Sequence, residues 1–587
     1  MKWIRENKRN YIVTLVGMCF LMLIFYNSFY WKSKDIGERK ILEAIIIFVG
    51  VVVVPFCAVR FSIINSWIKK KIDWILECIK YIVANWKKIV GFTGCLVIII
   101  GLSYGISCLL DKYYYHEEYN IYRFWLITVF NIVLFCMLVL RKYFKKKPEA
   151  AFLIAALSLG ILFIKMSPAT VGVSWDDEIH YKRTLQLSNA LNGIMYEADQ
   201  KNIDEYTYRI GAHSGFDRDS KKALEIEYNS LYEKKGTVSP SFEGVTVVSF
   251  AYLPGAIGIM IGRGLRLSYT QVFMMGKLFN LLMYVMLFYF AMKKIPQAKI
   301  LVAVIGLIPS LMFMASSYNY DPWLVGWTIL GYAYYFSVLQ QEGFAKSKDL
   351  AIAVLAITIG CFAKAIYFPL LFPLLFISKD RFRESKYAKL YKGIIILCGL
   401  ILVASFILPM LGNSQALDDV RGGTDVSAVG QLKFILSNPI HYAKILIKFL
   451  CSYLAVEKMS YFQFMAYAGN GALWGIITIT IFVVAFLDCG GNLRIGRMSK
   501  IMIIIGILGC MVLVPTSMYM GFTVVGAEYI EGCQFRYIFP VLFPTIYVLG
   551  NNNVYNKMSR QWFTIIPIVI MWFTCIDTIN MLFVSVY

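Results

Sequence analysis

The sequence is poor in charge for its length. Only 16% of its 587 residues are charged, whereas 59% are hydrophobic and the mean hydropathy is +0.62. A soluble domain cannot bury so large an apolar fraction. The composition therefore excludes a soluble globular protein and predicts a polytopic membrane protein.

Three further absences exclude particular kinds of protein. The sequence has no glycine-rich phosphate loop, internal repeat or low-complexity tract, which argues against a nucleotide-driven pump or a nucleotide-sugar enzyme of the Rossmann type. Its 13 cysteines follow no metal or disulfide spacing, and most lie in apolar runs, where cysteine behaves as a small hydrophobe. No small-residue cleavage site follows the first apolar run, so we expect that run to remain as an anchor.

The excess of basic residues indicates a lipid partner. The formal net charge is +22, which in a soluble chain would suggest nucleic acid. Here the lysines and arginines cluster in short loops between apolar runs. The predicted partners of this charge are therefore anionic membrane lipids, and no nucleic acid is expected.

Long apolar runs make up most of the chain. Crossing about 30 Å of hydrocarbon takes roughly 20 apolar residues as a helix. We therefore predict an all-α polytopic membrane protein with about 13–15 transmembrane helices. The candidate spans are residues 10–30, 41–62, 90–110, 122–140, 150–168, 271–292, 299–317, 322–340, 349–365, 366–378, 390–410, 471–488, 500–520, 536–550 and 562–584.

The loop charges orient these spans. If the N-terminus is cytoplasmic, most Lys and Arg residues of the short loops fall on the inner side, as the positive-inside rule requires. We predict a multi-pass protein of the plasma membrane with one large extracytoplasmic loop, residues 169–270. Segments 245–265 and 441–459 fit only as helices lying on the outer surface, and 67–88 fits an amphipathic helix on the inner leaflet.

The predicted organisation has three parts. Residues 1–149 form an N-terminal region with four spans and the inner-leaflet helix. Residues 150–550 form the membrane core with the large loop. Residues 551–587 carry the last span.

The most unusual polar segment is WDDEIH at residues 175–180, which directly follows an apolar span. Charge at a bilayer boundary is costly and tends to mark function. On a helix, Asp176, His180 and Arg183 would share one face. A carboxylate, an imidazole and a guanidinium could then converge.

This acidic motif has more than one interpretation. A carboxylate in a partly dry pocket can have a raised pKa and take a proton from an attacking hydroxyl. Asp176 and His180 could instead hold a divalent metal ion, although two ligands are a weak signal, and no other cofactor is indicated. The acids could also merely start a helix, because acidic residues are favoured in the first turn.

Further polar residues stand at the ends of other spans, on the same predicted side as the motif. They are Asp321, Lys364, Arg536 and Tyr537. Taken singly, each could belong to a structural ion pair. Taken together with the acidic motif, they predict a site for an anionic lipid headgroup.

Seven stretches of the chain follow one another in the order of a known family: SWDDEIHYKR, FAYLPGAIGIMIGRGLRLS, GKLFNLL, LIPSLMFMASSYNYD, FAKAIYFPLL, SNPIHY and EGCQFRYIFPVLFP. By these stretches the chain resembles a bacterial family of multi-pass membrane proteins called domain-of-unknown-function family 2142. The resemblance covers roughly residues 150–550, and the order and spacing of its pieces make it specific. The chain departs from the family in having Trp175–Asp176, where proline or a small residue is usual, and Phe535, where glycine is usual.

That family in turn looks like the GT-C glycosyltransferases, which take a sugar from a polyprenyl-phosphate carrier at the outer face. The resemblance implies a GT-C-like helical bundle in which an acid of the first large outer loop is the base. Asp177 matches this acid better than Asp176, and the segment around Pro254 matches the interfacial helix that follows. The candidate catalytic residues are Asp177, Asp176, Glu178 and His180, and the candidate substrate-binding residues are Arg183, Arg263, Asp321, Lys364, Arg536 and Tyr537.

Three functions stay open at this point. The resemblance implies an inverting glycosyltransferase that uses a polyprenyl-phosphate-linked sugar and a cell-envelope glycan or glycolipid acceptor. A transporter or flippase for lipid-linked or anionic cargo would also carry charge within its spans. A scaffold subunit of an envelope-polymer assembly is the third. Most ionisable residues stand at span ends and no inverted repeat is present, which favours the enzyme.

Overall fold

A computed structural model gives the structure in two compact units, Met1–Gly101 and Leu102–Tyr587. The predicted spans 10–30 and 41–62 and most of the predicted amphipathic helix 67–88 lie outside the described residues. Trp86 to Lys88, at the end of that segment, form the start of α6 (Trp86–Leu110). The structure describes residues 84, 86–193, 195–197, 199, 218–233, 237–238, 247–412, 425–488, 495–550, 554 and 556–584.

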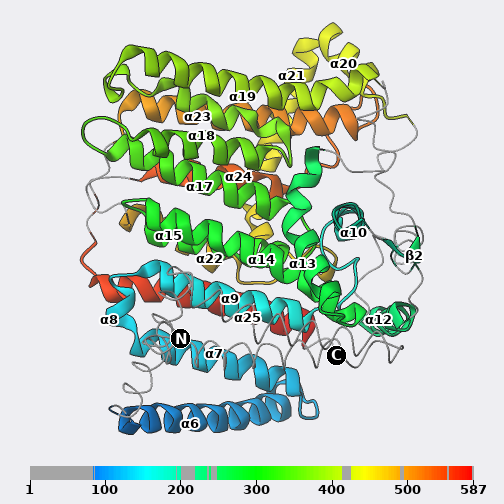
Figure 1. Ribbon diagram of the computed structural model, residues 1–587, viewed down its shortest axis with the longest axis vertical. Coiled ribbons are helices and arrows are strands. Elements are labelled where there is room, and N and C mark those ends of the chain that lie inside the picture. Colours follow the sequence, from blue (N-terminus) through cyan, green and yellow to red (C-terminus); the bar gives the residue numbers. More distant parts are fainter. Residues whose placement is uncertain are drawn as a thin grey trace, which may run out of the picture. The chain divides into compact units, whose positions relative to one another are not determined.

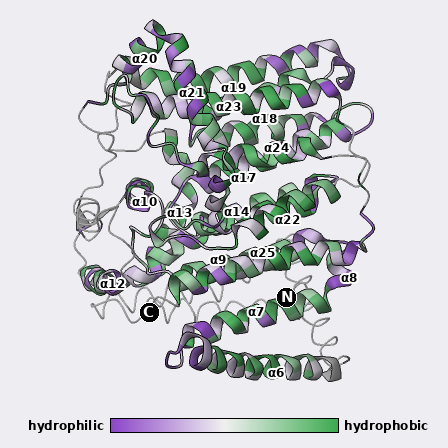
Figure 2. Ribbon diagram, turned by 180° about the vertical axis from the view of Figure 1, so that it is seen from behind, coloured by the Kyte–Doolittle hydropathy of each residue, from purple (hydrophilic) through white to green (hydrophobic). Residues whose placement is uncertain are grey.

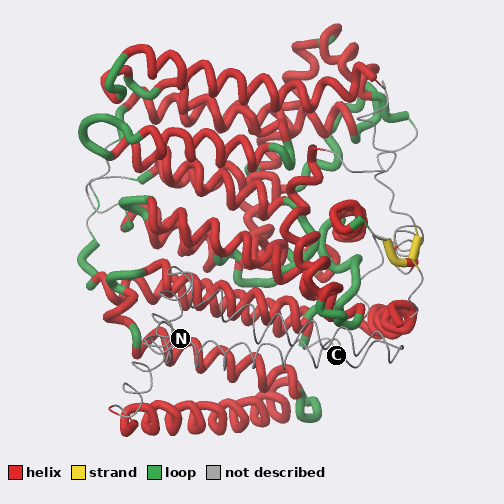
Figure 3. The backbone as a smooth tube through the Cα atoms, viewed as in Figure 1, coloured by secondary structure: helices red, strands yellow, loops and turns green. Residues whose placement is uncertain are grey.

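The described part of the second unit is almost entirely helical, which confirms the predicted all-α class (Figure 3). Two-residue strands, β1 (Met195–Tyr196) and β2 (Thr237–Val238), form one antiparallel pair. The π-helix is η2 (Asp111–Tyr115), and the 3₁₀ helices are η3 (Val247–Tyr252), η4 (Ala365–Phe376), η5 (Lys379–Arg381), η7 (Val456–Gln463), η8 (Ala466–Ala468) and η9 (Phe535–Ile538). The other helices are α7 (Ile121–Val139), α8 (Arg141–Phe144), α9 (Pro148–Met166), α10 (Asp177–Asn192), α12 (Arg218–Glu233), α13 (Leu253–Gly264), α14 (Tyr269–Lys294), α15 (Lys299–Gly306), α16 (Pro309–Ala315), α17 (Asp321–Gln340), α18 (Ser347–Cys361), α19 (Ser385–Gly412), α20 (Ala428–Ser437), α21 (Pro439–Tyr453), α22 (Trp474–Leu487), α23 (Arg497–Gly521), α24 (Phe539–Leu549) and α25 (Arg560–Phe583).

Seven of the described helices are long and apolar enough to cross a membrane, and each matches a predicted span. They are α6 with η2, α7, α9, α14, α19, α23 and α25. An eighth results if α21 and η7, which meet at 59°, are one broken span. The segment 441–459, which was predicted to lie on the outer surface, falls in this bent pair.

Other predicted spans are broken or short, and proline explains two of them. The span 299–317 is split into α15 and α16 just before Pro309, because the residue that precedes a proline disfavours the α conformation. The span 366–378 is the 3₁₀ helix η4, which contains Pro369 and Pro373. The spans 349–365, 471–488 and 536–550 form apolar helices of fewer than 18 residues. Helix α17, with 20 residues, covers the predicted span 322–340 but is not apolar enough to be counted. Of the 13 predicted spans that fall on described residues, seven are thus helices both long and apolar enough to cross a membrane.

The long helices of the second unit lie side by side (Figure 1). Helix α9 packs on α14, α14 on α17, α17 on α18, and η4 contacts α18, α19 and α23. Helices α10, α12 and α13 lie on one side of this row, beside the right-hand ends of the long helices in Figure 1. Hydrophobic residues predominate along the long helices, and hydrophilic residues gather near their ends (Figure 2). Such a pattern is expected when the helix bodies face lipid and the ends face water.

The 3₁₀ helix η4 depends on two tyrosines of α17. The carbonyl oxygen of Leu370 cannot accept a 3₁₀ hydrogen bond from residue 373, because that residue is proline and has no N–H. The Tyr332 hydroxyl donates to this oxygen at 3.0 Å, and the Tyr335 hydroxyl donates to the Pro373 carbonyl oxygen at 3.2 Å. An unpaired carbonyl in hydrocarbon costs several kcal/mol. The two hydroxyls therefore stabilise a proline-broken segment inside the helix row.

We expect the substitution Tyr332→Phe to lower the free energy of unfolding by about 1–3 kcal/mol, because it leaves the Leu370 carbonyl buried without a donor. The measurement is SDS-driven unfolding of the purified protein in mixed micelles. Tyr334→Phe is the matched control on the same helix, because no hydrogen bond of the Tyr334 hydroxyl is seen among the described residues. Equal stability of the two variants would contradict this role of Tyr332.

Candidate functional site

The acidic motif begins α10, and a left-handed turn directs its two aspartates apart. Asp176 precedes the helix with φ 51° and ψ 24°, a conformation that aspartate tolerates better than most residues. Asp177 is 1% exposed, and its carboxylate accepts the N–H groups of Gly172 at 2.6 Å and Ser174 at 3.2 Å. Asp177 thus folds the preceding loop onto the helix N-terminus, whereas Asp176 faces the other way.

Asp176 lies in a cluster of four charged side chains that come from distant parts of the chain. Arg536, in η9, donates to Asp176 across 2.9 Å and forms an ion pair with Asp321 at 3.5 Å. Lys364 donates to the other oxygen of Asp321 at 3.0 Å. We call Asp176, Asp321, Lys364 and Arg536 the charge cluster. The structure therefore brings together four of the residues that the sequence indicated.

Aromatic rings surround the two cations of the cluster. The Lys364 ammonium lies 3.8 Å from the ring centroid of Tyr537 and 4.9 Å from that of Tyr320. The Arg536 guanidinium lies 5.1 Å from the Trp175 ring and 5.4 Å from the Tyr537 ring. Such cation–π contacts hold charge where water is scarce. Tyr537, a predicted site residue, thus faces the cluster through its ring.

The cluster is mostly buried but still has hydrogen-bonding capacity. The side chains of Arg536 and Asp321 are 3% and 7% exposed, whereas those of Lys364 and Asp176 are 17% and 25% exposed. Among the described residues, Nε and Nη1 of Arg536 and one oxygen of Asp321 have no hydrogen-bond partner. Buried polar atoms of this kind are rare and call for an explanation, such as a ligand. The guanidinium can therefore take an additional acceptor.

The turn before α17 attaches the cluster to the acidic loop. The backbone N–H of Asp321 donates to the side-chain oxygen of Asn319 at 2.7 Å, and the Asn319 amide donates to the Trp175 carbonyl oxygen at 3.3 Å. Ser317 donates to the Ser174 hydroxyl at 3.1 Å. These bonds fix Asp321 relative to the loop that carries Asp176.

His180 lies at the edge of the cluster and not inside it. Its Nδ1 is 2.9 Å from the Tyr252 hydroxyl, and its ring packs edge-on against Tyr320 with centroids 4.6 Å apart. Burial lowers the pKa of His180 to about 4, although Asp176 and Asp321 oppose this shift. A neutral imidazole is therefore expected at physiological pH.

Two predicted substrate-binding arginines lie outside the charge cluster. Arg263, in α13, donates to Asn189 at 2.7 Å and forms an ion pair with Asp199, so it ties α13 to α10 in a separate network. Arg183 lies on α10. Burial raises the pKa of Tyr252, and the positive charge of Arg183 opposes this rise. Arg263 is thus better explained as a structural residue than as a phosphate ligand.

Glu178 and Lys277 complete the buried charges near the motif. Glu178 is 3% exposed, and its charge contributes to a raised pKa of Tyr467, for which burial is the main cause. Lys277 donates to the Pro168 carbonyl oxygen at 3.4 Å. Burial raises the pKa of Asp177, and the charge of Lys277 opposes this rise. Sequence reasoning missed Lys277, although a lysine within the apolar run GKLFNLL was a usable signal.

The described residues give little support for a protein-bound metal ion. Within them, no three His, Cys, Asp or Glu side chains lie close enough together to hold one. Asp176 is bound to Arg536, and His180 Nδ1 faces Tyr252. The predicted pair Asp176 and His180 therefore has no third ligand of these types in that part of the chain.

The lowered pKa of His180 predicts a pH-dependent contribution to stability. Between pH 6.5 and about 4, the unfolded chain binds a proton at this position that the folded chain does not bind. The contribution of the neutral His180 to the free energy of unfolding is therefore complete above pH 6.5 and is lost as the pH falls through this range. We expect the free energy of unfolding of the wild type, relative to His180→Gln, to fall by up to roughly 3 kcal/mol. Parallel pH profiles of the two proteins, measured by unfolding in micelles, would contradict the assignment.

The comparison with known proteins bears on the predicted membrane core. The family of predicted membrane proteins called domain of unknown function 2142 (DUF2142) matches residues 157–544. This range contains the whole charge cluster and lies within the region 150–550 in which the sequence showed the resemblance. No curated protein and no solved structure matches the chain. The match covers more than half of the chain, and the protein therefore belongs to the DUF2142 family of membrane proteins.

Proposed function

We propose that this protein is a membrane glycosyltransferase that moves a sugar from a polyprenyl-phosphate-linked donor to a cell-envelope acceptor. The charge cluster is its active centre, on the face that the loop charges predict to be extracytoplasmic. The observation that carries the proposal is Arg536, whose buried guanidinium contacts two carboxylates and keeps two nitrogens without a hydrogen bond among the described residues.

The cations of the cluster suit the phosphate of the donor. Arginine N–H groups bind phosphate oxygens strongly, and among the described residues Nε of Arg536 has no partner while Nη1 has only the long ion pair with Asp321. Lys364 is partly exposed and adds a second positive charge nearby. As the sugar leaves, negative charge grows on the phosphate oxygen. Fixed cations at that position would stabilise the transition state more than the ground state.

Asp176 suits the role of the base better than Asp177 does. Its side chain is 25% exposed, so an acceptor hydroxyl can reach it. Asp177 is almost fully buried, and both of its oxygens already accept backbone N–H groups. In the proposed step, the acceptor oxygen bonds to the anomeric carbon and its proton passes to Asp176. The bond from that carbon to the phosphate oxygen breaks, and its electron pair stays on the phosphate. Attack opposite the phosphate inverts the anomeric centre.

The neighbouring aromatic residues suit a sugar. Tyr252 and Tyr320 lie beside His180 next to the cluster, and Trp175 and Tyr537 contact its cations. Aromatic rings present apolar faces with a polar tip at one edge, which suits a sugar with both C–H and hydroxyl surfaces. Neutral His180 can accept or donate a hydrogen bond at its remaining nitrogen.

The proposal is tested with the purified full chain in nanodiscs. The assay measures the release of polyprenyl phosphate from a panel of labelled polyprenyl-phosphate sugars, with membrane glycolipid extract as acceptor. Release that requires the acceptor supports the transferase. Movement of the labelled lipid between leaflets without release would support the flippase instead, and neither activity would favour a scaffold.

Replacing each of the two aspartates by asparagine distinguishes a catalytic role from a structural one. We expect Asp176→Asn to lower the transfer rate by a factor of about 100 or more, because the base is lost while the shape is kept. Asp177→Asn should mainly lower the free energy of unfolding, by about 1–3 kcal/mol, because one backbone N–H loses its acceptor. Glu384→Gln, an exposed acid, is the control and should alter neither. Full activity of Asp176→Asn would remove Asp176 from the mechanism.

A further inference from the structure

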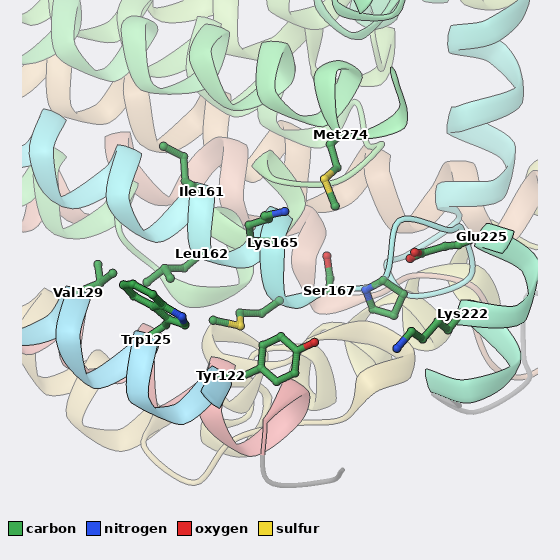
Figure 4. A pocket seen from close by; sticks show the side chains of 12 residues that line it. Tyr122, Trp125, Val129, Ile161, Leu162, Lys165, Ser167, Lys222, Glu225 and Met274 are labelled. Atoms are coloured by element: carbon green, nitrogen blue, oxygen red, sulfur yellow. The ribbon is translucent and has the colours of Figure 1, made fainter. Parts of the chain in front are cut away.

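A pocket lies beside the start of the loop that leads to the acidic motif, and none of the charge-cluster residues lines it. It occupies about 480 Å³ between α7, the end of α9, α12 and α14 (Figure 4). Because α7 and α9 are both long and apolar enough to cross a membrane, one side of the pocket consists of spanning helices. A ligand could therefore reach this pocket from the lipid phase.

The two ends of the pocket differ in chemistry. The charged side chains, Lys165 in the last turn of α9 and Lys222 and Glu225 on α12, line the part of the pocket away from Val129 (Figure 4). The Ser167 hydroxyl lies among them (Figure 4). The other end is lined by apolar side chains such as Trp125 and Leu162. Charge at one end and hydrocarbon at the other is the arrangement that an amphiphile requires.

The two lysines are available for a ligand. Both are exposed, and within the described residues neither has an ion-pair partner. Glu225 also lines the pocket, but its carboxylate accepts the N–H of Ala169. The lining thus carries two lysines without an ion-pair partner among the described residues and one acid that already has a partner.

We infer that this pocket binds one lipid with an anionic phosphate headgroup. The phosphate lies between Lys165 and Lys222, and the start of a hydrocarbon chain lies along α7 and α9. Tyr122 and Trp125, 42% and 51% exposed, are the amphipathic residues that favour the membrane–water boundary, which is where such a headgroup lies. This inference does not rest on the proposed function, because it uses other residues and requires no reaction.

The test uses the delipidated full chain in detergent, to which brominated phosphatidylglycerol is added. Bromine quenches tryptophan fluorescence at short range, and the part of the quenching that disappears in Trp125→Phe reports the pocket. Lys165→Gln combined with Lys222→Gln should weaken binding about thirtyfold, because each lysine contributes a factor of about five near an anionic lipid. The control Lys386→Gln, an exposed lysine paired with Glu384, should leave the affinity unchanged.

Competitors identify the source of the lipid. Displacement by unlabelled phosphatidylglycerol or by polyprenyl phosphate supports the inference, and the tighter of the two is the natural class. Phosphatidylcholine, which has no net charge, should compete poorly. Glycerol phosphate that competes as well as the lipid would overturn the inference, because the apolar end would then contribute nothing. Equal affinity of the wild type and the double-lysine variant would overturn it as well.

Discussion

The buried guanidinium of Arg536 is the constraint on which the geometry of the site depends. Removing such a cation from water costs several kcal/mol unless carboxylates and hydrogen bonds offset the loss. Its two acids come from α10 and from the start of α17, and Asp176 lies 360 residues away along the chain. Folding must therefore bring η9, α10 and α17 to one point. The two acids and two cations balance in charge, which keeps this assembly stable while it has no ligand.

The apolar runs of the sequence predict where most of the long helices lie, but not whether each run forms one unbroken helix. The seven described helices that are long and apolar enough to cross a membrane all coincide with predicted spans, because about twenty apolar residues form a helix wherever backbone groups must pair internally. Pro309, Pro369 and Pro373 break the apolar runs in which they stand, although those runs are long enough to span. Local backbone chemistry determined the helix ends there, whereas the length rule considers composition alone.

The sequence predicted which residues belong to the site, but not the direction in which each side chain points. Asp321, Lys364 and Arg536 were found because ionisable side chains at the ends of apolar runs are costly. The choice between Asp176 and Asp177 depended on a single left-handed residue, which turns neighbouring side chains to opposite sides. Arg263 has the same chemistry as Arg536, yet it is held by Asp199 and Asn189. No sequence pattern distinguishes these cases, because the partners are distant along the chain.

The hydrogen bonds of the Tyr332 and Tyr335 hydroxyls to η4 also affect the position of the Asp321–Lys364 ion pair. They fix the register of α17 against η4, since a slide of one turn would leave the carbonyl oxygens of Leu370 and Pro373 without these donors. Asp321 is the first residue of α17, and Lys364 directly precedes η4. Helix α17 therefore carries the acid of the Asp321–Lys364 ion pair at its start, and the lysine stands at the start of η4. The hydroxyls of Tyr332 and Tyr335 thus help to set the distance between the Asp321 carboxylate and the Lys364 ammonium group, several helical turns away.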